Sequence, residues 1–170
     1  MTKKIALIKG DGTGPELIKV TSDLLNEFIP NSVELIFCEA GYNWWSNNHG
    51  DSLIPEETIN ILDESDFCLK GPTVTPTTPN SPRSVAVTIR QKYQLYANVR
   101  PIKSFVKNSE YKDIDFICVR EATEGMYSGI GFTINDETAI SIRKITKTSC
   151  DRVANFAFQL ADNRNWNKVI

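Results

Sequence analysis

The sequence predicts an α/β protein with a mostly parallel sheet and flanking helices. Along residues 1–70, short apolar runs alternate with segments in which apolar residues recur at helical spacing. Continuous apolar runs are typical of strands that are buried on both faces of a parallel sheet. Glycine and proline separate the segments. With 170 residues, the chain is long enough to form a domain with a hydrophobic core.

The first strand and helix are indicated by residues 5–30. Residues 5–8 are an apolar run that predicts a buried strand, and residues 10–16 form a glycine-rich turn in which Pro15 begins a helix. The turn lacks the full spacing of a dinucleotide fingerprint, so we interpret it as a tight strand-to-helix connection. Pro30 closes the helix, whose apolar residues recur at helical spacing: Leu17, Val20, Leu24 and Phe28.

Two further strands and a helix follow. Residues 33–38 predict the second strand, Pro55 opens a helix in which Ile59 and Leu62 point inward, and residues 66–69 predict the third strand. Alternation of this kind is typical of a parallel sheet with right-handed crossovers.

A long loop interrupts this alternation. Residues 71–82 contain four prolines and five threonines or serines, which is turn-forming chemistry. Open α/β sheets bind ligands beyond the carboxyl ends of their strands, so the loop is a candidate binding segment. Lys70 enters it directly after the third strand, and its ammonium is a candidate ligand contact.

The second half of the chain predicts fewer elements. Helical propensity resumes at residues 85–93, and residues 115–119 read as another buried strand. Ile140 and Ile142 alternate with polar residues, as in a half-exposed strand. Thr148 and Asp151 have the spacing of a capping box before an apolar helical stripe. Residues 168–170 resemble the start of another strand.

Three arginines and one tyrosine are the main candidate site. Arg90, Arg100, Arg120 and Tyr127 lie at short spacing. Arginine keeps its charge and grips carboxylates through a planar fork, so the cluster suits a small polyanion. A tyrosine beside such charges could move a proton. The alternative is that these are ordinary surface arginines, because charge clusters are often structural.

Composition narrows the classes of function. The net charge of −2 argues against general nucleic-acid binding, and no apolar run approaches the length of a membrane span. The apolar run near the start is too short for a signal peptide, which leaves the cytoplasm as the expected location. The four cysteines are widely spaced and there is one histidine, so we expect no metal site or disulfide framework.

Four motifs in order carry a family resemblance. They are Gly-Asp-Gly-Thr-Gly-Pro-Glu at 10–16, Leu-Lys-Gly-Pro-Thr-Val-Thr-Pro at 69–76, Ser-Val-Ala-Val-Thr-Ile-Arg-Gln-Lys-Tyr-Gln-Leu-Tyr-Ala-Asn-Val-Arg-Pro at 84–101 and Val-Arg-Glu-Ala-Thr-Glu-Gly-Met-Tyr-Ser-Gly-Ile at 119–130. Together they resemble the isocitrate/3-isopropylmalate dehydrogenase family, in its N-terminal half only. Ser84 and the segment that follows it are more similar to isocitrate dehydrogenase.

The resemblance implies a truncated fold of that family. Residues 1–100 would form the first half of a large α/β domain, and residues 101–170 would begin a smaller α/β domain, unless both pack as one unit. The sheet would then lack its remaining strands. A second copy of the chain or a partner chain would cover the exposed sheet.

Roles for individual residues also follow from the resemblance. Arg90, Arg100 and Arg120 would bind the carboxylates of a malate-type acid or tricarboxylate, and Ser84 would donate a hydrogen bond to the distal carboxylate. Tyr127 would be the catalytic acid that protonates the enol after carbon dioxide leaves. The cofactor-binding residues would be Lys70 and Thr75, near the nicotinamide. Ala86 and Ala122 stand where asparagine is typical, and Gly125 and Gly131 where an acidic residue is usual. These departures suggest either relaxed constraint or an altered substrate.

The implied activity is oxidative decarboxylation of isocitrate or a related acid with NAD or NADP and Mg²⁺ or Mn²⁺, the metal stabilising the enolate. The catalytic lysine, the metal-binding aspartates and the adenine loop of the family have no counterpart in these residues. We therefore expect little turnover by this chain alone. For the cofactor, the alternative to the implied NAD or NADP and metal is that this short chain binds none. The alternative function is a non-catalytic protein that captures a tricarboxylate or docks on a protein partner.

Overall fold

The computed structural model describes residues 2–78, 81–106, 110–166 and 168–170, and it divides into two compact units. Unit 1 comprises residues 1–88 and unit 2 residues 89–170. We describe each unit by itself. The change of unit falls within helix α4 (Val85–Lys92), and the predicted division into residues 1–100 and 101–170 stays a prediction. Strand β4 (Ala97–Lys103) pairs with its neighbour along its whole length.

Unit 1 contains the predicted parallel sheet. Its strands are β1 (Lys3–Ile8), β2 (Val33–Cys38) and β3 (Phe67–Lys70), in the order β2-β1-β3, and both pairs are parallel. The central strand supplies much of the core, because Ala6, Leu7 and Ile8 are fully buried. The continuous apolar run of the first strand therefore has the predicted cause.

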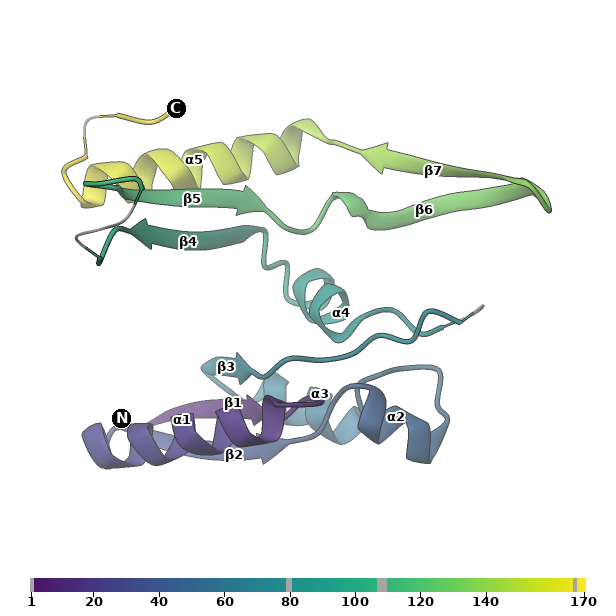
Figure 1. Ribbon diagram of the computed structural model, residues 1–170, viewed down its shortest axis with the longest axis horizontal. Helices are drawn as coiled ribbons and strands as arrows, with labels where there is room; N and C mark the ends of the chain where they lie inside the picture. The colour runs from purple at the N-terminus through teal and green to yellow at the C-terminus, as the bar shows by residue number, and fades with distance from the viewer. Residues whose placement is uncertain (1, 79–80, 107–109, 167) are drawn as a thin grey trace. The chain divides into compact units, whose positions relative to one another are not determined.

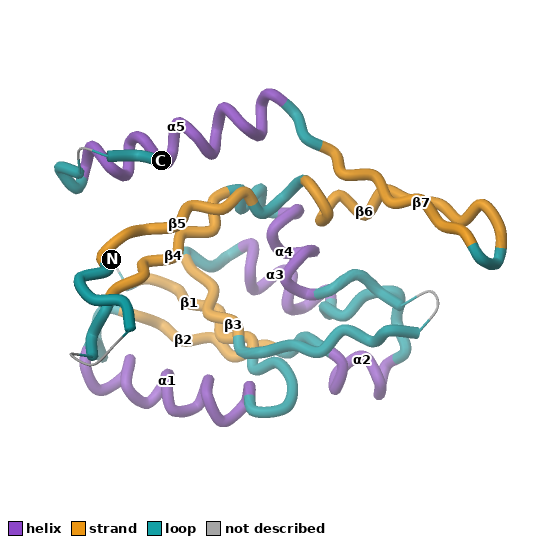
Figure 2. Tube along the Cα trace, turned by 45° about the horizontal axis from the view of Figure 1, so that its top comes forward, coloured by secondary structure: helices purple, strands orange, loops and turns teal. Residues whose placement is uncertain are grey.

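Helices cover both faces of this sheet. Helix α1 (Gly14–Phe28) lies on one side and helix α3 (Glu56–Asp63) on the other, as right-handed crossovers require (Figures 1 and 2). Pro15 stands at the start of α1 as predicted. Helix α2 (Tyr42–Asn48) was not predicted; it ends at His49, whose left-handed backbone forms the C-cap.

The buried face of α1 is not the face that carries its large apolar residues, as their helical spacing would suggest. Gly14, Ile18 and Ser22 are buried, and the larger apolar residues are exposed: Leu17, Val20, Leu24 and Phe28. Two of the three buried residues, Gly14 and Ser22, are small, and the stripe of large apolar residues with the strongest periodicity is exposed.

Unit 2 contains two antiparallel pairs and one long helix. Strand β4 pairs with β5 (Asp115–Glu121), β6 (Gly125–Asn135) pairs with β7 (Thr138–Lys144), and α5 (Lys147–Asn163) contacts β5 (Figure 1). The prediction that residues 115–119 form a buried strand was right about the strand and wrong about burial, since most of its residues are exposed. Strand β7 is exposed along its full length rather than half-exposed.

Three terminal and loop predictions have different outcomes. The capping box at Thr148 is wrong: Thr146 caps α5, and its hydroxyl accepts a hydrogen bond from the Ser149 amide at 3.2 Å. No strand forms at residues 168–170 among the described residues. The predicted loop at 71–82 is confirmed where it is described, and residues 79–80 lie outside the described part.

Candidate functional site: an arginine–tyrosine cluster

Tyr127 is the residue around which two of the three predicted arginines gather. Nη2 of Arg120, on β5, donates a hydrogen bond to the Tyr127 hydroxyl at 2.8 Å. The guanidinium carbons of Arg120 and Arg90 lie 5.4 Å and 5.7 Å from the centre of the Tyr127 ring. Both distances are within the range of cation–π attraction. The structure therefore places a phenol beside two permanent positive charges.

The third arginine lies on the same hairpin as Arg120. Asn98 on β4 pairs directly with Arg120 on β5, and Arg100 is two residues further along β4. Side chains two residues apart in a strand point to the same face, so Arg100 and Arg120 share one face of the pair. The Arg100 side chain is exposed, and its Nε donates to Asn98 Oδ1 at 3.1 Å. Two guanidinium groups on one strand pair can both reach a carboxylate-bearing ligand.

Ser84 has the geometry of a helix cap. It lies in unit 1 directly before α4, and its hydroxyl accepts a hydrogen bond from the Val87 amide at 3.2 Å. An N-terminal cap of this kind fixes the serine side chain. A hydroxyl that accepts one hydrogen bond still has its own hydrogen to donate, as the predicted carboxylate contact requires.

Lys70 and Thr75 lie on the loop that follows β3 in unit 1. The Lys70 ammonium donates to the Gly71 carbonyl at 2.7 Å and to the Thr73 hydroxyl at 3.3 Å, so it braces the loop. Thr75 is half-buried. This description applies to the loop as far as residue 78.

Asp11 anchors the loop and was not singled out from the sequence. Its carboxylate is 3% exposed and accepts hydrogen bonds from three backbone amides, those of Tyr42 and Asn43 in α2 and that of Val74 in the loop, at 2.6–2.9 Å. One buried carboxylate thus joins the glycine turn, the start of α2 and the loop that bears Thr75. Its place inside the glycine-rich motif was the available signal, and that motif has a mainly structural role here.

The glycine turn does not form a phosphate cradle. A Cβ at Gly10 would lie 2.0 Å from the Pro72 carbonyl oxygen, and one at Gly14 would lie 2.3 Å from that of Lys9. The glycines therefore admit the protein's own backbone, so the turn is a poor fit for a nucleotide phosphate. The interpretation as a tight structural connection accounts for it.

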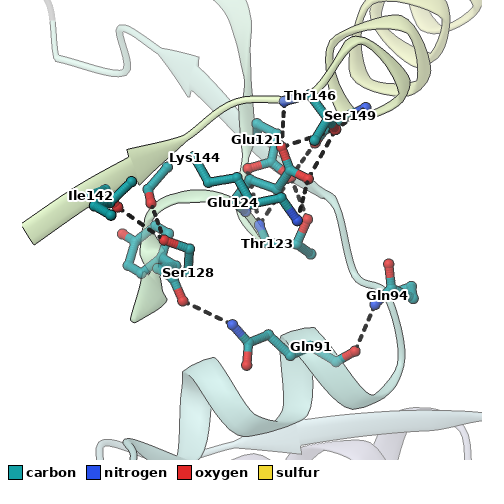
Figure 3. A network of polar contacts seen from close by, with 12 residues as sticks. Gln91, Gln94, Glu121, Thr123, Glu124, Ser128, Ile142, Lys144, Thr146 and Ser149 are labelled. Atoms are coloured by element: carbon teal, nitrogen blue, oxygen red, sulfur yellow. Dashed lines mark hydrogen bonds and ion pairs between the residues drawn. The ribbon is translucent and has the colours of Figure 1, made fainter. Parts of the chain in front are cut away.

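A second group of polar residues surrounds the loop between β5 and β6 (Figure 3). Glu121 accepts hydrogen bonds from the backbone amides of Thr123 and Glu124 and from the Ser149 hydroxyl at 2.9–3.1 Å. Glu124 accepts from the Thr146 amide and hydroxyl at 2.8 and 2.9 Å. These contacts fasten the segment before Tyr127 to the start of α5. Both glutamates lie in a family motif, but no periodicity in the sequence indicated their partners.

The hydrogen bonds set the charge of both carboxyl groups. Burial favours the neutral form of Glu121, but donors from Thr123, Glu124 and Ser149 outweigh it and lower the pKa. Burial also opposes ionisation of Glu124, and donors from Thr146 together with the Lys144 charge lower its pKa. The native network is therefore built for two carboxylates.

Unit 2 should lose stability in acid. A carboxyl whose pKa is lowered by folding stabilises the native state when the pH is above the ordinary pKa of 4.5. This contribution is lost as the pH falls through the lowered pKa of the folded state. We expect the urea concentration at the midpoint of unfolding to decrease as the pH is lowered below about 4.5. The free-energy difference between wild type and Glu121→Gln should shrink over the same range. Glu137→Gln, an exposed change between β6 and β7, is the matched control; an equal effect of pH on both variants would contradict the assignment.

The described residues contain no group of three or more His, Cys, Asp or Glu that could hold a metal ion. They therefore do not fit the divalent metal of the resembled family, and no chemistry of this chain is derived through one. No helix in the described segments is long and apolar enough to cross a membrane.

Comparison with known proteins identifies the family. The sequence model described as isocitrate/isopropylmalate dehydrogenase matches residues 4–170. This chain belongs to the isocitrate/isopropylmalate dehydrogenase family. The resemblance found in the four motifs and the α/β fold class are both confirmed.

Individual relatives come from both branches of the family. The chain is 37% identical over 169 residues to the probable mitochondrial isocitrate dehydrogenase (NAD) subunit alpha of Drosophila melanogaster, covering 99% of this chain and 44% of the relative. It is 34% identical over 165 residues to the 3-isopropylmalate dehydrogenase of Saccharolobus solfataricus, covering 95% and 47%. The crystal structure of isocitrate dehydrogenase from Methylococcus capsulatus matches with a TM-score of 0.87 and 33% identity, covering 97% of this chain and 49% of that one. The chain thus spans about half the length of the curated relatives it matches, in agreement with the expected N-terminal half.

Proposed function

We propose that these 170 residues carry the carboxylate-binding part of a β-decarboxylating dehydrogenase. The ligand would be isocitrate or a related malate-type acid, with Arg90, Arg100 and Arg120 holding its carboxylates and Ser84 donating to the distal one. The observation that carries the proposal is the contact of Arg120 and Arg90 with Tyr127. Permanent charges on rigid elements are well suited to orienting a polyanion.

The proton step would use Tyr127. Its oxygen accepts a hydrogen bond from Arg120, so the phenolic hydrogen points away from that guanidinium and remains available to a ligand. In the proposed reaction, Tyr127 Oη gives this proton to the carbon that carbon dioxide has left. NAD or NADP, when bound, would accept the hydride of the preceding oxidation. Lys70 and Thr75 are the residues that we propose beside its nicotinamide.

We further propose that the 170 residues by themselves bind without turning over substrate. The resemblance assigns the catalytic lysine and the metal-binding aspartates to sequence beyond the residues matched here, and the chain covers 44–49% of its relatives. The alternative function, a non-catalytic tricarboxylate-binding or partner-docking protein, predicts the same binding and the same lack of turnover for the isolated chain. Joining the chain to the remaining part of a relative separates the two, because only the dehydrogenase proposal predicts restored activity.

The experiment is a pair of measurements on the purified protein. Calorimetric titration with citrate or isocitrate should show saturable binding that weakens as salt increases. Reduction of NAD or NADP in the presence of isocitrate and magnesium should be absent. Clear turnover would refute the proposal of binding without catalysis, and failure to bind either acid would refute the carboxylate pocket.

Exposed apolar side chains support a proposal about partners. Unit 2 exposes Phe132 and Ile134 on β6 and Ile140 and Ile142 on β7, and unit 1 exposes the apolar stripe of α1. A two-stranded pair with both faces in water is marginal by itself. We propose that a second copy or a partner chain covers such surfaces, which a solution mass above 19.1 kDa would support.

A further inference from the structure

Gln91 connects the helix that bears Arg90 to the backbone of Tyr127. Nε2 of Gln91, on α4, donates a half-buried hydrogen bond to the Tyr127 carbonyl oxygen at 2.8 Å. Arg90 is the preceding residue of the same helix, and its guanidinium faces the Tyr127 ring. Tyr127 is therefore held by its ring and by its carbonyl from two consecutive residues.

The backbone around Tyr127 needs such an anchor. Gly125 and Gly129 stand two residues before and after it, with φ angles of +68° and +65°. Glycine adopts this region without strain and leaves the chain freer than any other residue does. The Tyr127 amide donates only a long hydrogen bond, 3.3 Å, to the Glu124 carbonyl. The carbonyl contact from Gln91 is the shorter of these two backbone restraints.

The amide of Gln91 acts from a fixed position. The backbone carbonyl oxygen of Gln91 accepts hydrogen bonds from the Gln94 side-chain Nε2 at 2.9 Å and from the Gln94 backbone amide at 3.4 Å. The Gln94 side-chain oxygen in turn accepts from Nη1 of Arg152 on α5 at 3.0 Å. The end of α4 is thus tied to α5, and the Gln91 side chain extends from this support to the tyrosine.

We propose that Gln91 is a positioning residue that keeps the Tyr127 phenol beside Arg90 and Arg120. It touches no ligand itself. Gln91 holds the Tyr127 carbonyl, which lies between two conformationally free glycines. It thereby fixes the backbone position from which the Tyr127 side chain extends, and with it the direction in which the hydroxyl contacts a bound acid. This inference rests on the proposed role of Tyr127 in binding and proton transfer.

The test uses the purified 170-residue chain with isotope-labelled tyrosine rings, the Tyr127 resonance being assigned with Tyr127→Phe. Gln91→Leu removes the donor at similar volume, and Gln91→Asn keeps an amide but withdraws it by one methylene. Asn47→Leu is the matched control, because it removes a side-chain amide that donates to a helix carbonyl, that of Asn43 in α2 at 2.9 Å, and lies in unit 1, outside the contacts that support Gln91. Thermal unfolding is recorded for all variants.

Both Gln91 variants should move or broaden the Tyr127 resonance and weaken citrate binding by about three- to tenfold, the range expected for one neutral hydrogen bond. Asn47→Leu should leave that resonance in place. An unchanged resonance in both Gln91 variants would overturn the inference, whatever citrate does. A changed resonance in a protein that binds no citrate would support the positioning role and refute the proposed function instead.

Discussion

Replacing Arg120 by alanine should reduce the affinity for citrate or isocitrate by about 30-fold or more. A hydrogen bond to a charged group contributes about 1.5–3 kcal/mol, and each 1.4 kcal/mol is a factor of ten in affinity. Arg120 would contribute twice, because it binds the ligand and also holds the Tyr127 hydroxyl at 2.8 Å. Calorimetric titration at fixed, low salt measures the change.

Two further variants separate charge from geometry. Arg120→Lys keeps the positive charge but loses the planar fork, so an intermediate loss is expected. Arg164→Ala removes an arginine at the end of α5 whose guanidinium lies over the Trp166 ring. It should change the affinity for the acid by no more than about twofold, because single surface charges contribute little energy. Equal losses for Arg120→Ala and Arg164→Ala would mean that only net charge attracts the acid, and the ordered pocket would be refuted.

The sequence predicts the elements of unit 1 because local signals bound each one. The run at residues 5–8, the proline at position 15 and the run at 33–38 correspond to β1, the start of α1 and β2. The buried face of α1 could not be predicted in this way. Two of its three buried residues, Gly14 and Ser22, are small, whereas periodicity indicates only where the large apolar residues fall.

Unit 2 shows where sequence patterns stop being informative. Strands β6 and β7 are exposed almost throughout. Because neither strand has a buried face, no alternation of apolar and polar residues is needed, and the sequence pattern cannot indicate the strands. The contact between Gln91 and Tyr127 joins residues 36 positions apart, and no spacing rule relates an amide on a helix to a carbonyl in a distant turn. The arginines and Tyr127 could be chosen because their chemistry is visible in residue type. The residues that hold them have ordinary polar side chains, and only coordinates identify their partners.

Replacing Gly10 by alanine should destabilise unit 1 by about 4 kcal/mol, at the upper end of single substitutions. Its φ of +72° already penalises a side chain, and the new Cβ would lie 2.0 Å from the Pro72 carbonyl oxygen. Pro72 cannot easily move away from the new Cβ. Its carbonyl accepts the Asp11 amide at 2.7 Å, and the loop beyond it is held by the Asp11 carboxylate through Val74.

Gly12→Ala is the matched control for this collision. Gly12 has a similar φ of +57°, but nothing lies within 4 Å of its added Cβ, so only the left-handed penalty of about 1–2 kcal/mol applies. Urea unfolding followed by tryptophan fluorescence in a Trp166→Phe background reports unit 1 alone, because the other two tryptophans are Trp44 and Trp45. Equal losses at both glycines would show that the loop yields to the new methyl group. The larger loss at Gly10 would show instead that the turn and the loop bearing Thr75 form one rigid support, held together by the buried Asp11 carboxylate.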